Sequence, residues 1–181
     1  MAQDESGVTL LELLIALMFL ALLMGMGVGS FKPLLQKIRL QSQAEDLLAG
    51  LFLARSEAIK RGMRVTACVS SDGMHCLSKA DWDQGWLIFE DVDGNAIRAD
   101  SEALIQVHAA MPPKIKASGN SPVSRYVSYA PTGRSLYVSG AFQAGTITLC
   151  EVNEQSSNAW DLVINAVGKP RLEKITGGAC P

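Results

Sequence analysis

The chain opens with a long apolar stretch. From Val8 through Phe31 the sequence has 24 residues, and Glu12 is the only charged one among them. As a helix rising ~1.5 Å per residue, this run would extend ~36 Å, enough to cross a hydrocarbon core of ~30 Å. We therefore predict a transmembrane and assembly helix over residues 8–31. A carboxylate inside such a segment costs ~2.5–3.5 kcal/mol, so Glu12 is a candidate functional residue that needs a partner.

Two ordinary interpretations compete with this one. The segment could be a signal peptide that is removed whole, but its apolar run is longer than the usual ~7–15 residues and no A-x-A-like site follows closely. It could also be a plain membrane anchor of a periplasmic domain that never polymerises, with Glu12 placed by accident.

The helical pattern continues beyond the apolar run. Small and aliphatic residues recur at spacings of three and four, as on one face of an amphipathic helix. They are Leu40, Ala44, Leu47, Leu51, Ala54 and Ala58. Arg61 followed by Gly62 is typical of a helix C-terminus. We predict an amphipathic continuation over residues 32–62.

After Gly62 the pattern changes to short runs rich in β-branched and aromatic residues, which indicates a β-rich globular domain over residues 63–181. The predicted strands are Arg64–Val69, Trp86–Glu90, Ala103–His108, Arg125–Ala130, Ser135–Ser139, Gly145–Val152, Trp160–Val167 and Lys169–Lys174. Asp91–Asn95 is predicted to form a hairpin turn, and Met111–Pro122 a loop. The plan is α+β, with one long N-terminal helix packed on antiparallel sheets.

Composition adds two constraints. Beyond residues 1–7 the chain has 16 basic and 16 acidic side chains, so any contact with nucleic acid must come from a local patch. Four cysteines follow the apolar run, and an even number in an exported domain favours two disulfides. Three pairings are possible; we favour Cys68–Cys76, which closes a short loop, with Cys150–Cys180, which ties a late strand to the tail.

The start of the chain resembles the class III signal of type IV pilins and pseudopilins, in which a Gly precedes the cleaved bond and an acid follows ahead of an unbroken apolar helix. The resemblance implies a leader at residues 1–7 cut by a prepilin peptidase between Gly7 and Val8, and N-methylation of Val8. It also implies that Glu12 pairs with a neighbouring subunit's terminal ammonium during assembly. Two features depart from the pattern: Val8 replaces the usual Phe, and Met1–Gly7 lacks Lys and Arg.

Further elements narrow the family. They are Ala54–Arg61, Asp81-Trp82, Gly85–Phe89, Asp91, Asp93-Gly94, Pro131-Thr132-Gly133 and Val167–Arg171. In this order they resemble the GspH/FimT family of minor pilins and type II secretion minor pseudopilins, over essentially the whole chain. The resemblance implies a type IV pilin fold and a non-enzymatic structural subunit. It would lie in the inner membrane with a periplasmic domain and then in a fibre, with other pilins or pseudopilins as partners.

The resemblance leaves the assembly open. We favour a minor pilin of a type IV pilus, because the paired cysteines, with Cys180 one residue from the end, resemble the FimT/FimU side of the family. The alternative is the H-type minor pseudopilin of a type II secretion system, which shares this fold. FimT-type members used in DNA uptake have a Gly-Arg-x-Arg near the C-terminus, which corresponds here to Gly168–Arg171, with Lys169 replacing the first Arg. Lys169, Arg171, Lys174 and Arg134, joined by Arg125 if the strands are adjacent, are therefore candidate DNA contacts. The alternative is a strand edge guarded by charges against aggregation.

Other candidate chemistry is weak. Asp91-x-Asp93-Gly94 resembles the start of a Ca²⁺ loop whose last ligand would be Glu102, but the sequence between suggests a strand, so we expect no metal. Trp82 and Trp86 are expected to be core anchors rather than ligand platforms. His75 and His108 are far apart and lack a nucleophile partner, so we expect neither catalytic site nor cofactor.

Overall fold

The computed structural model describes residues 7–152, 158–176 and 180, apart from the side chains of residues 23–33, 158 and 176. The chain divides into two compact units, Met1–Arg39 and Leu40–Pro181. The leader residues 1–6 of the sequence prediction lie outside the described residues. The elements, in chain order, are α1 Leu10–Arg61, β1 Val65–Val69, η1 Trp82–Gln84, β2 Trp86–Glu90, β3 Leu104–His108, β4 Ile115–Gly119, η2 Ser121–Val123, β5 Tyr126–Tyr129, β6 Gly145–Glu151, β7 Asn158–Ile164 and β8 Pro170–Thr176.

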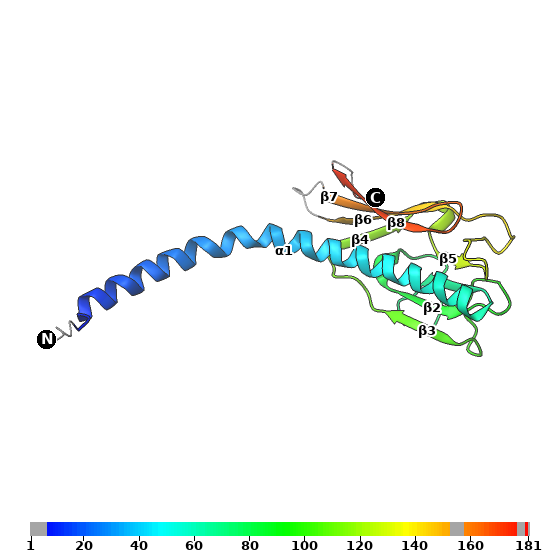
Figure 1. The fold of residues 1–181 in the computed structure, drawn as a ribbon, viewed down its shortest axis with the longest axis horizontal. Helices are drawn as coiled ribbons and strands as arrows, with labels where there is room; N and C mark the ends of the chain where they lie inside the picture. Colours follow the sequence, from blue (N-terminus) through cyan, green and yellow to red (C-terminus); the bar gives the residue numbers. More distant parts are fainter. Residues whose placement is uncertain (1–6, 153–157, 177–179, 181) are drawn as a thin grey trace, which may run out of the picture. The chain divides into compact units, whose positions relative to one another are not determined.

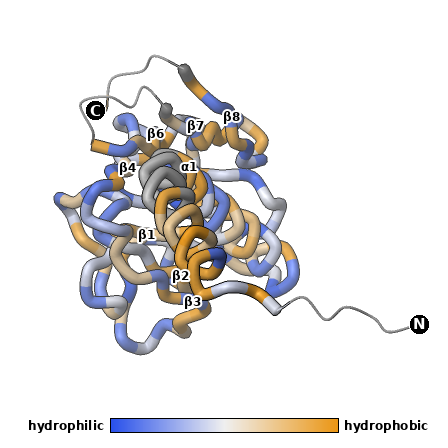
Figure 2. Tube along the Cα trace, turned by 90° about the vertical axis from the view of Figure 1, so that its left-hand side faces the viewer, coloured by the Kyte–Doolittle hydropathy of each residue, from blue (hydrophilic) through white to orange (hydrophobic). Residues whose placement is uncertain are grey.

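The first unit contains the beginning of α1. Figure 2 shows its described first turns as a mainly hydrophobic tube. In the part of the chain that the structure describes, no helix combines the length and the hydropathy needed to cross a membrane. The predicted span, residues 8–31, falls partly on residues 23–31, whose side chains lie outside the description.

The second unit begins with the C-terminal half of α1, whose predicted apolar face is confirmed. All six of its residues are at most 2 % exposed: Leu40, Ala44, Leu47, Leu51, Ala54 and Ala58. The predicted end of the helix is also confirmed, because α1 ends at Arg61 and Gly62 follows with φ of 66°. The Gly62 N–H donates to the Ala58 carbonyl oxygen at 3.1 Å, which satisfies one of the last helix carbonyls.

Two antiparallel four-stranded sheets complete this unit, in the orders β3-β2-β1-β5 and β4-β6-β7-β8. Figures 1 and 2 show the first sheet on one side of the C-terminal half of α1 and the second sheet on the other. One apolar core joins all three layers: Leu47 and Leu51 of the helix share it with Ile88 of β2 and Leu149 of β6. The predicted α+β plan is confirmed.

Three local predictions were wrong. The predicted loop Met111–Pro122 contains β4, whose Ile115 and Ala117 are buried and which pairs with β6. The Pro pair precedes this strand, and Ser118 and Gly119 of the Ser-Gly-Asn segment are its last two residues. The predicted hairpin at Asp91–Asn95 is the first part of a longer connection over residues 91–103, although β2 and β3 are antiparallel neighbours.

The third wrong prediction is the strand Ser135–Ser139, where the structure has only isolated bridges. The buried side chain of Gln143 explains the difference. Its Oε1 accepts the Ser128 N–H at 3.0 Å, and its Nε2 donates to the Pro122 and Tyr126 carbonyl oxygens. An amide side chain thus satisfies backbone groups that a continuous strand would otherwise pair.

Candidate functional site

The predicted cleavage site lies ahead of the helix. Gly7, Val8 and Thr9 are outside α1, which begins at Leu10. Val8 is 74 % exposed, and a Cβ added at Gly7 would meet no atom of the described residues within 4 Å. The Gly7–Val8 bond is therefore in non-helical, uncrowded backbone, as a peptidase requires of the chain it cuts.

Glu12 lies in the first turn of α1, where the positive end of the helix dipole stabilises its carboxylate. Its N–H donates to the Thr9 Oγ1 at 3.3 Å and to the Thr9 carbonyl oxygen at 3.1 Å, so Thr9 caps the helix. Among the described residues, the Glu12 carboxylate has neither a hydrogen bond nor an ion pair. The sequence signal for this cap, Thr-x-x-Glu, is the capping-box pattern and was missed by the sequence analysis.

The described turns around Glu12 present an apolar surface. These side chains are 48–77 % exposed: Val8, Leu10, Leu11, Leu13, Leu14, Ile15, Leu17, Met18, Phe19, Leu20 and Leu22. They occupy every direction around the helix rather than one stripe, unlike the single buried face of the C-terminal half. A helix that is apolar all round is typical of burial in a membrane or in the core of an assembly.

Polar contacts fix the C-terminal half of α1 to the sheets. The Arg55 Nε donates to the Gly133 carbonyl oxygen at 2.8 Å. Near the helix end, Arg61 makes ion pairs with Glu57 and with Glu90 of β2. The hydrogen bond from Arg61 holds the pKa of the Glu57 carboxyl below its ordinary value. The helix is thus anchored where it ends.

Both disulfides of the favoured pairing are present. Cys68 of β1 is joined to Cys76, and Cys150 of β6 is joined to Cys180, each with 5.6 Å between the Cα atoms. The first bond closes a loop of the first sheet, and the second ties the C-terminal segment to the second sheet. Both are typical of a domain that folds in an oxidising compartment.

The connection after β2 gathers carboxylates. Oxygens of Asp91, Asp93 and Glu102 lie within 4.8 Å of one another, so these residues could hold a cation. Both Glu102 oxygens already accept backbone N–H groups, from Val92 at 2.8 Å and from Ala99 at 2.9 Å. The expectation of a strand between Asp93 and Glu102 was wrong, since this segment is irregular.

Asp91 is the buried member of this group. It is 1 % exposed and accepts hydrogen bonds from the Thr66 hydroxyl at 2.7 Å and from the Ala96 N–H. Burial raises the pKa of the Asp91 carboxyl, because it disfavours the charged form. Ala96, whose N–H donates to Asp91, has a φ of 60°. It is the only non-glycine residue with a positive φ in the described chain. The carboxylates therefore shape the loop.

The structure separates the candidate DNA contacts. Arg171 and Lys174 both lie on the edge strand β8, but alternation places them on opposite faces. Arg171 also pairs with Glu173 at 2.6 Å. Arg125 precedes β5 of the first sheet and does not join them.

One proximity that sequence could not reveal brings two of the candidates together. Gly168, at φ 79°, packs so closely on another loop that an added Cβ would lie 2.5–3.1 Å from the backbone of Gly133, Arg134 and Ser135. Lys169 directly follows Gly168, so its backbone lies near that of Arg134, and both residues are exposed.

Trp82 and Trp86 are confirmed as core anchors. Trp82 is fully buried, and its indole donates to the Val123 carbonyl oxygen at 2.9 Å. Trp86 is 1 % exposed and stacks on His108, with 3.8 Å between ring centroids.

Comparison with known proteins identifies the family to which the chain is similar. The family described as type II transport protein GspH matches residues 43–168. No curated protein matches in a sequence search.

Solved structures share the fold. The type IV minor pilin FimU of Pseudomonas aeruginosa superposes with a TM-score of 0.57 at 23 % identity, covering 76 % of this chain and 90 % of FimU. The minor pseudopilin EpsH of the Vibrio cholerae type II secretion system gives 0.50 at 10 % identity, covering 78 % of this chain and 99 % of EpsH. At these identities the likeness concerns the fold.

Proposed function

The chain belongs to the GspH family of minor pilins and pseudopilins, and from this premise we propose that it enters a type IV pilus as a non-catalytic minor subunit. The observation that carries the proposal is the exposed, all-round apolar start of α1, with Glu12 in its first turn and without a partner for its carboxylate among the described residues. Contact of such a surface with water is unfavourable, so we expect another apolar phase to cover it.

We propose that this phase is first the inner membrane and then the fibre core. A prepilin peptidase would cut between Gly7 and Val8, and methylation would follow at Val8. The new terminal ammonium of a neighbouring subunit would then meet Glu12, because a carboxylate in an apolar environment is costly until an opposite charge pairs with it. The two disulfides support placing the globular domain in the periplasm.

Deletion of the gene tests the choice of fibre. Loss of surface pili and of twitching, both restored by the intact gene, is the expected result. Retained pili with lost release of exported proteins would contradict the pilus proposal. That result would favour the alternative, an H-type minor pseudopilin of a type II secretion system, which the description of the matched family also supports.

DNA binding is a second candidate function. The packing of Gly168 on the Gly133–Ser135 backbone supports it, because it brings the backbone of the exposed residue Lys169 near that of the exposed residue Arg134. The Arg171–Glu173 ion pair weakens it. The purified full chain in detergent should shift duplex DNA at low salt, with affinity falling as salt rises. Lys169→Ala with Arg134→Ala should weaken this shift, whereas Lys79→Ala should not; equal binding by both variants would contradict it.

A further inference from the structure

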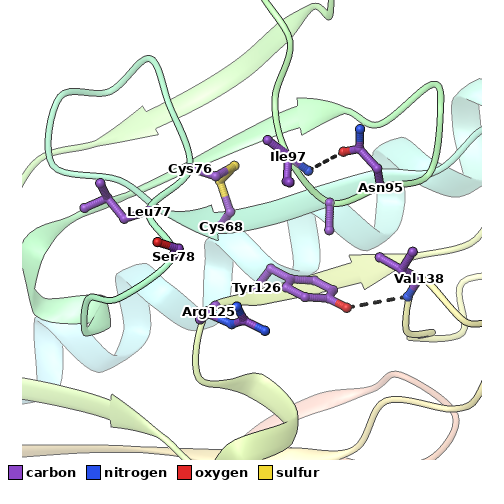
Figure 3. Close-up of a pocket in the computed structure, with 10 residues that line it drawn as sticks. Cys68, Cys76, Leu77, Ser78, Asn95, Ile97, Arg125, Tyr126 and Val138 are labelled. Carbon is purple, nitrogen blue, oxygen red and sulfur yellow. Dashed lines mark hydrogen bonds between the residues drawn. A yellow bond between two sulfur atoms is a disulfide. The ribbon is translucent and has the colours of Figure 1, made fainter.

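A pocket of about 280 Å³ lies on the first sheet, on the face opposite to α1 (Figure 3). Cys68 of β1 forms part of it. Its neighbours Ala67 and Val69 belong to the core around the helix, so alternation turns Cys68 to the other face. Four chain segments meet here: the disulfide loop, residues 95–97, the start of β5 and the loop at Val138.

Local bonds hold these walls in place. The Cys68–Cys76 disulfide fixes one wall. In the wall formed by residues 95–97, the Asn95 Oδ1 accepts a hydrogen bond from the Ile97 N–H at 2.6 Å. The Val138 N–H points to the Tyr126 hydroxyl oxygen at 3.5 Å, the contact drawn in Figure 3. The pocket is therefore formed before any ligand arrives.

The polar groups left over in the pocket are donors. Within the described residues, the Arg125 guanidinium has neither an ion-pair nor a hydrogen-bond partner. The Tyr126 hydroxyl only accepts a bond, so its own proton is free, and the Ser78 hydroxyl has no bond there either. No acidic side chain is among the lining residues. The group that fits is an anionic acceptor, and guanidinium groups match carboxylates particularly well.

Size and apolar surface restrict the ligand further. The volume lies just below the ~300–1,000 Å³ of small-molecule sites, which leaves room for one or two side chains. Ile97 and Val138 are 63 % and 50 % exposed at the pocket, so an aliphatic group beside the anion would also be covered.

We propose that this pocket anchors an acidic segment of a partner protein, in which a carboxylate side chain lies next to an aliphatic one. The carboxylate meets Arg125 and the Tyr126 hydroxyl, and the aliphatic side chain packs on Ile97 and Val138. Charge complementarity selects the occupant, because the pocket offers a positive charge and free donors, and none of the described residues that line it is acidic. The anchor concerns the side surface of the domain and does not depend on which fibre the subunit enters.

The test is a methyl NMR titration of the full chain in detergent, observing Ile97 and Val138. The probes are the capped dipeptides acetyl-Leu-Glu-amide and acetyl-Leu-Gln-amide, which differ only in charge, and sodium acetate. We expect saturable shifts with the Glu peptide in the low millimolar range, and affinity about tenfold weaker with the Gln peptide. Arg125→Gln should weaken binding of the Glu peptide to a similar degree. Arg134 is an exposed Arg outside the pocket, so the matched control Arg134→Gln should leave the affinity for the Glu peptide unchanged.

Three results would overturn the proposal. They are equal affinity for the Glu and Gln peptides, equal affinity of Arg125→Gln and Arg134→Gln for the Glu peptide, and acetate binding as tightly as the peptide. The last would assign the pocket to a small anion. The peptide comparison uses the parent protein, so the test stands even if Arg125→Gln folds poorly.

Discussion

The indole Nε1 of Trp82 donates a hydrogen bond of 2.9 Å to the carbonyl oxygen of Val123, joining two segments 41 residues apart. Both residues are fully buried, and they belong to the short helices η1 and η2. This bond joins the short helix before β2 to the short helix between β4 and β5.

Trp82→Phe should therefore destabilise the domain by about 2–4 kcal/mol, since it leaves a buried carbonyl unpaired and opens a cavity. Denaturant unfolding followed by circular dichroism measures the change. Trp160→Phe is the matched control, because Trp160 is only partly buried. A loss for Trp160→Phe as large as that for Trp82→Phe would contradict the role given to the bond.

The two disulfides should contribute unequally. They close loops with sequence separations of 8 and 30 residues. Loop-closure entropy then predicts losses of about 2.5 kcal/mol for the paired Cys68→Ser, Cys76→Ser variant and about 3.6 kcal/mol for Cys150→Ser, Cys180→Ser. The order of the two unfolding free energies is the quantity to compare, and a reversed order would count against this account.

Asp91 predicts a specific pH dependence. Burial raises the pKa of its carboxyl in the folded state, so folding favours the protonated form. Its contribution to stability is present at low pH and is lost as pH rises from the unfolded pKa of about 3.9 through the raised folded pKa. Unfolding free energies across this range should show that Asp91→Asn removes this fall, whereas Asp93→Asn, an exposed neighbour, should preserve it. Identical profiles for the parent and Asp91→Asn would contradict the assignment.

Calcium should leave the domain unchanged. The Glu102 oxygens and the Asp91 carboxylate already bond to groups of their own loop or of β1. Thermal unfolding in millimolar CaCl₂ should match that in MgCl₂ of equal ionic strength. A rise in melting temperature with Ca²⁺ alone, lost in Asp93→Asn, would show that the loop is a calcium site after all.

The sequence was informative where one regular period dominates. The six buried positions from Leu40 to Ala58 follow a helical repeat, and Gly62 ends that helix because it can adopt positive φ. Such signals are local, so the sequence contains them in full.

The failures have a non-local cause. Strand β4 depends on pairing with β6, which outweighs the turn-forming residues before the strand and at its C-terminal end. The side chain of Gln143 bonds to the backbone of Ser128, 15 residues earlier, and Gly168 packs closely on the backbone of Arg134. The carbonyl that accepts the Trp82 bond likewise belongs to a residue far along the chain. No periodic pattern of residues in the sequence indicates any of these contacts.

Glu12→Gln should abolish incorporation into the fibre while leaving the unfolding of the globular domain unchanged, because it removes the charge that meets a neighbour's terminal ammonium. Thr9→Ala is the control: it removes the helix cap and keeps the acid. Immunoblots of sheared fibres compare the two. Normal incorporation of Glu12→Gln, or equal loss in both variants, would show that Glu12 acts only in helix capping or not at all.

The most direct test of the central claim is intact mass and N-terminal analysis of the protein from cells with and without the prepilin peptidase. We expect a chain that starts at methylated Val8 only when the peptidase is present. A chain that still starts at Met1 in both strains, or that is cut elsewhere by the ordinary signal peptidase, would contradict it.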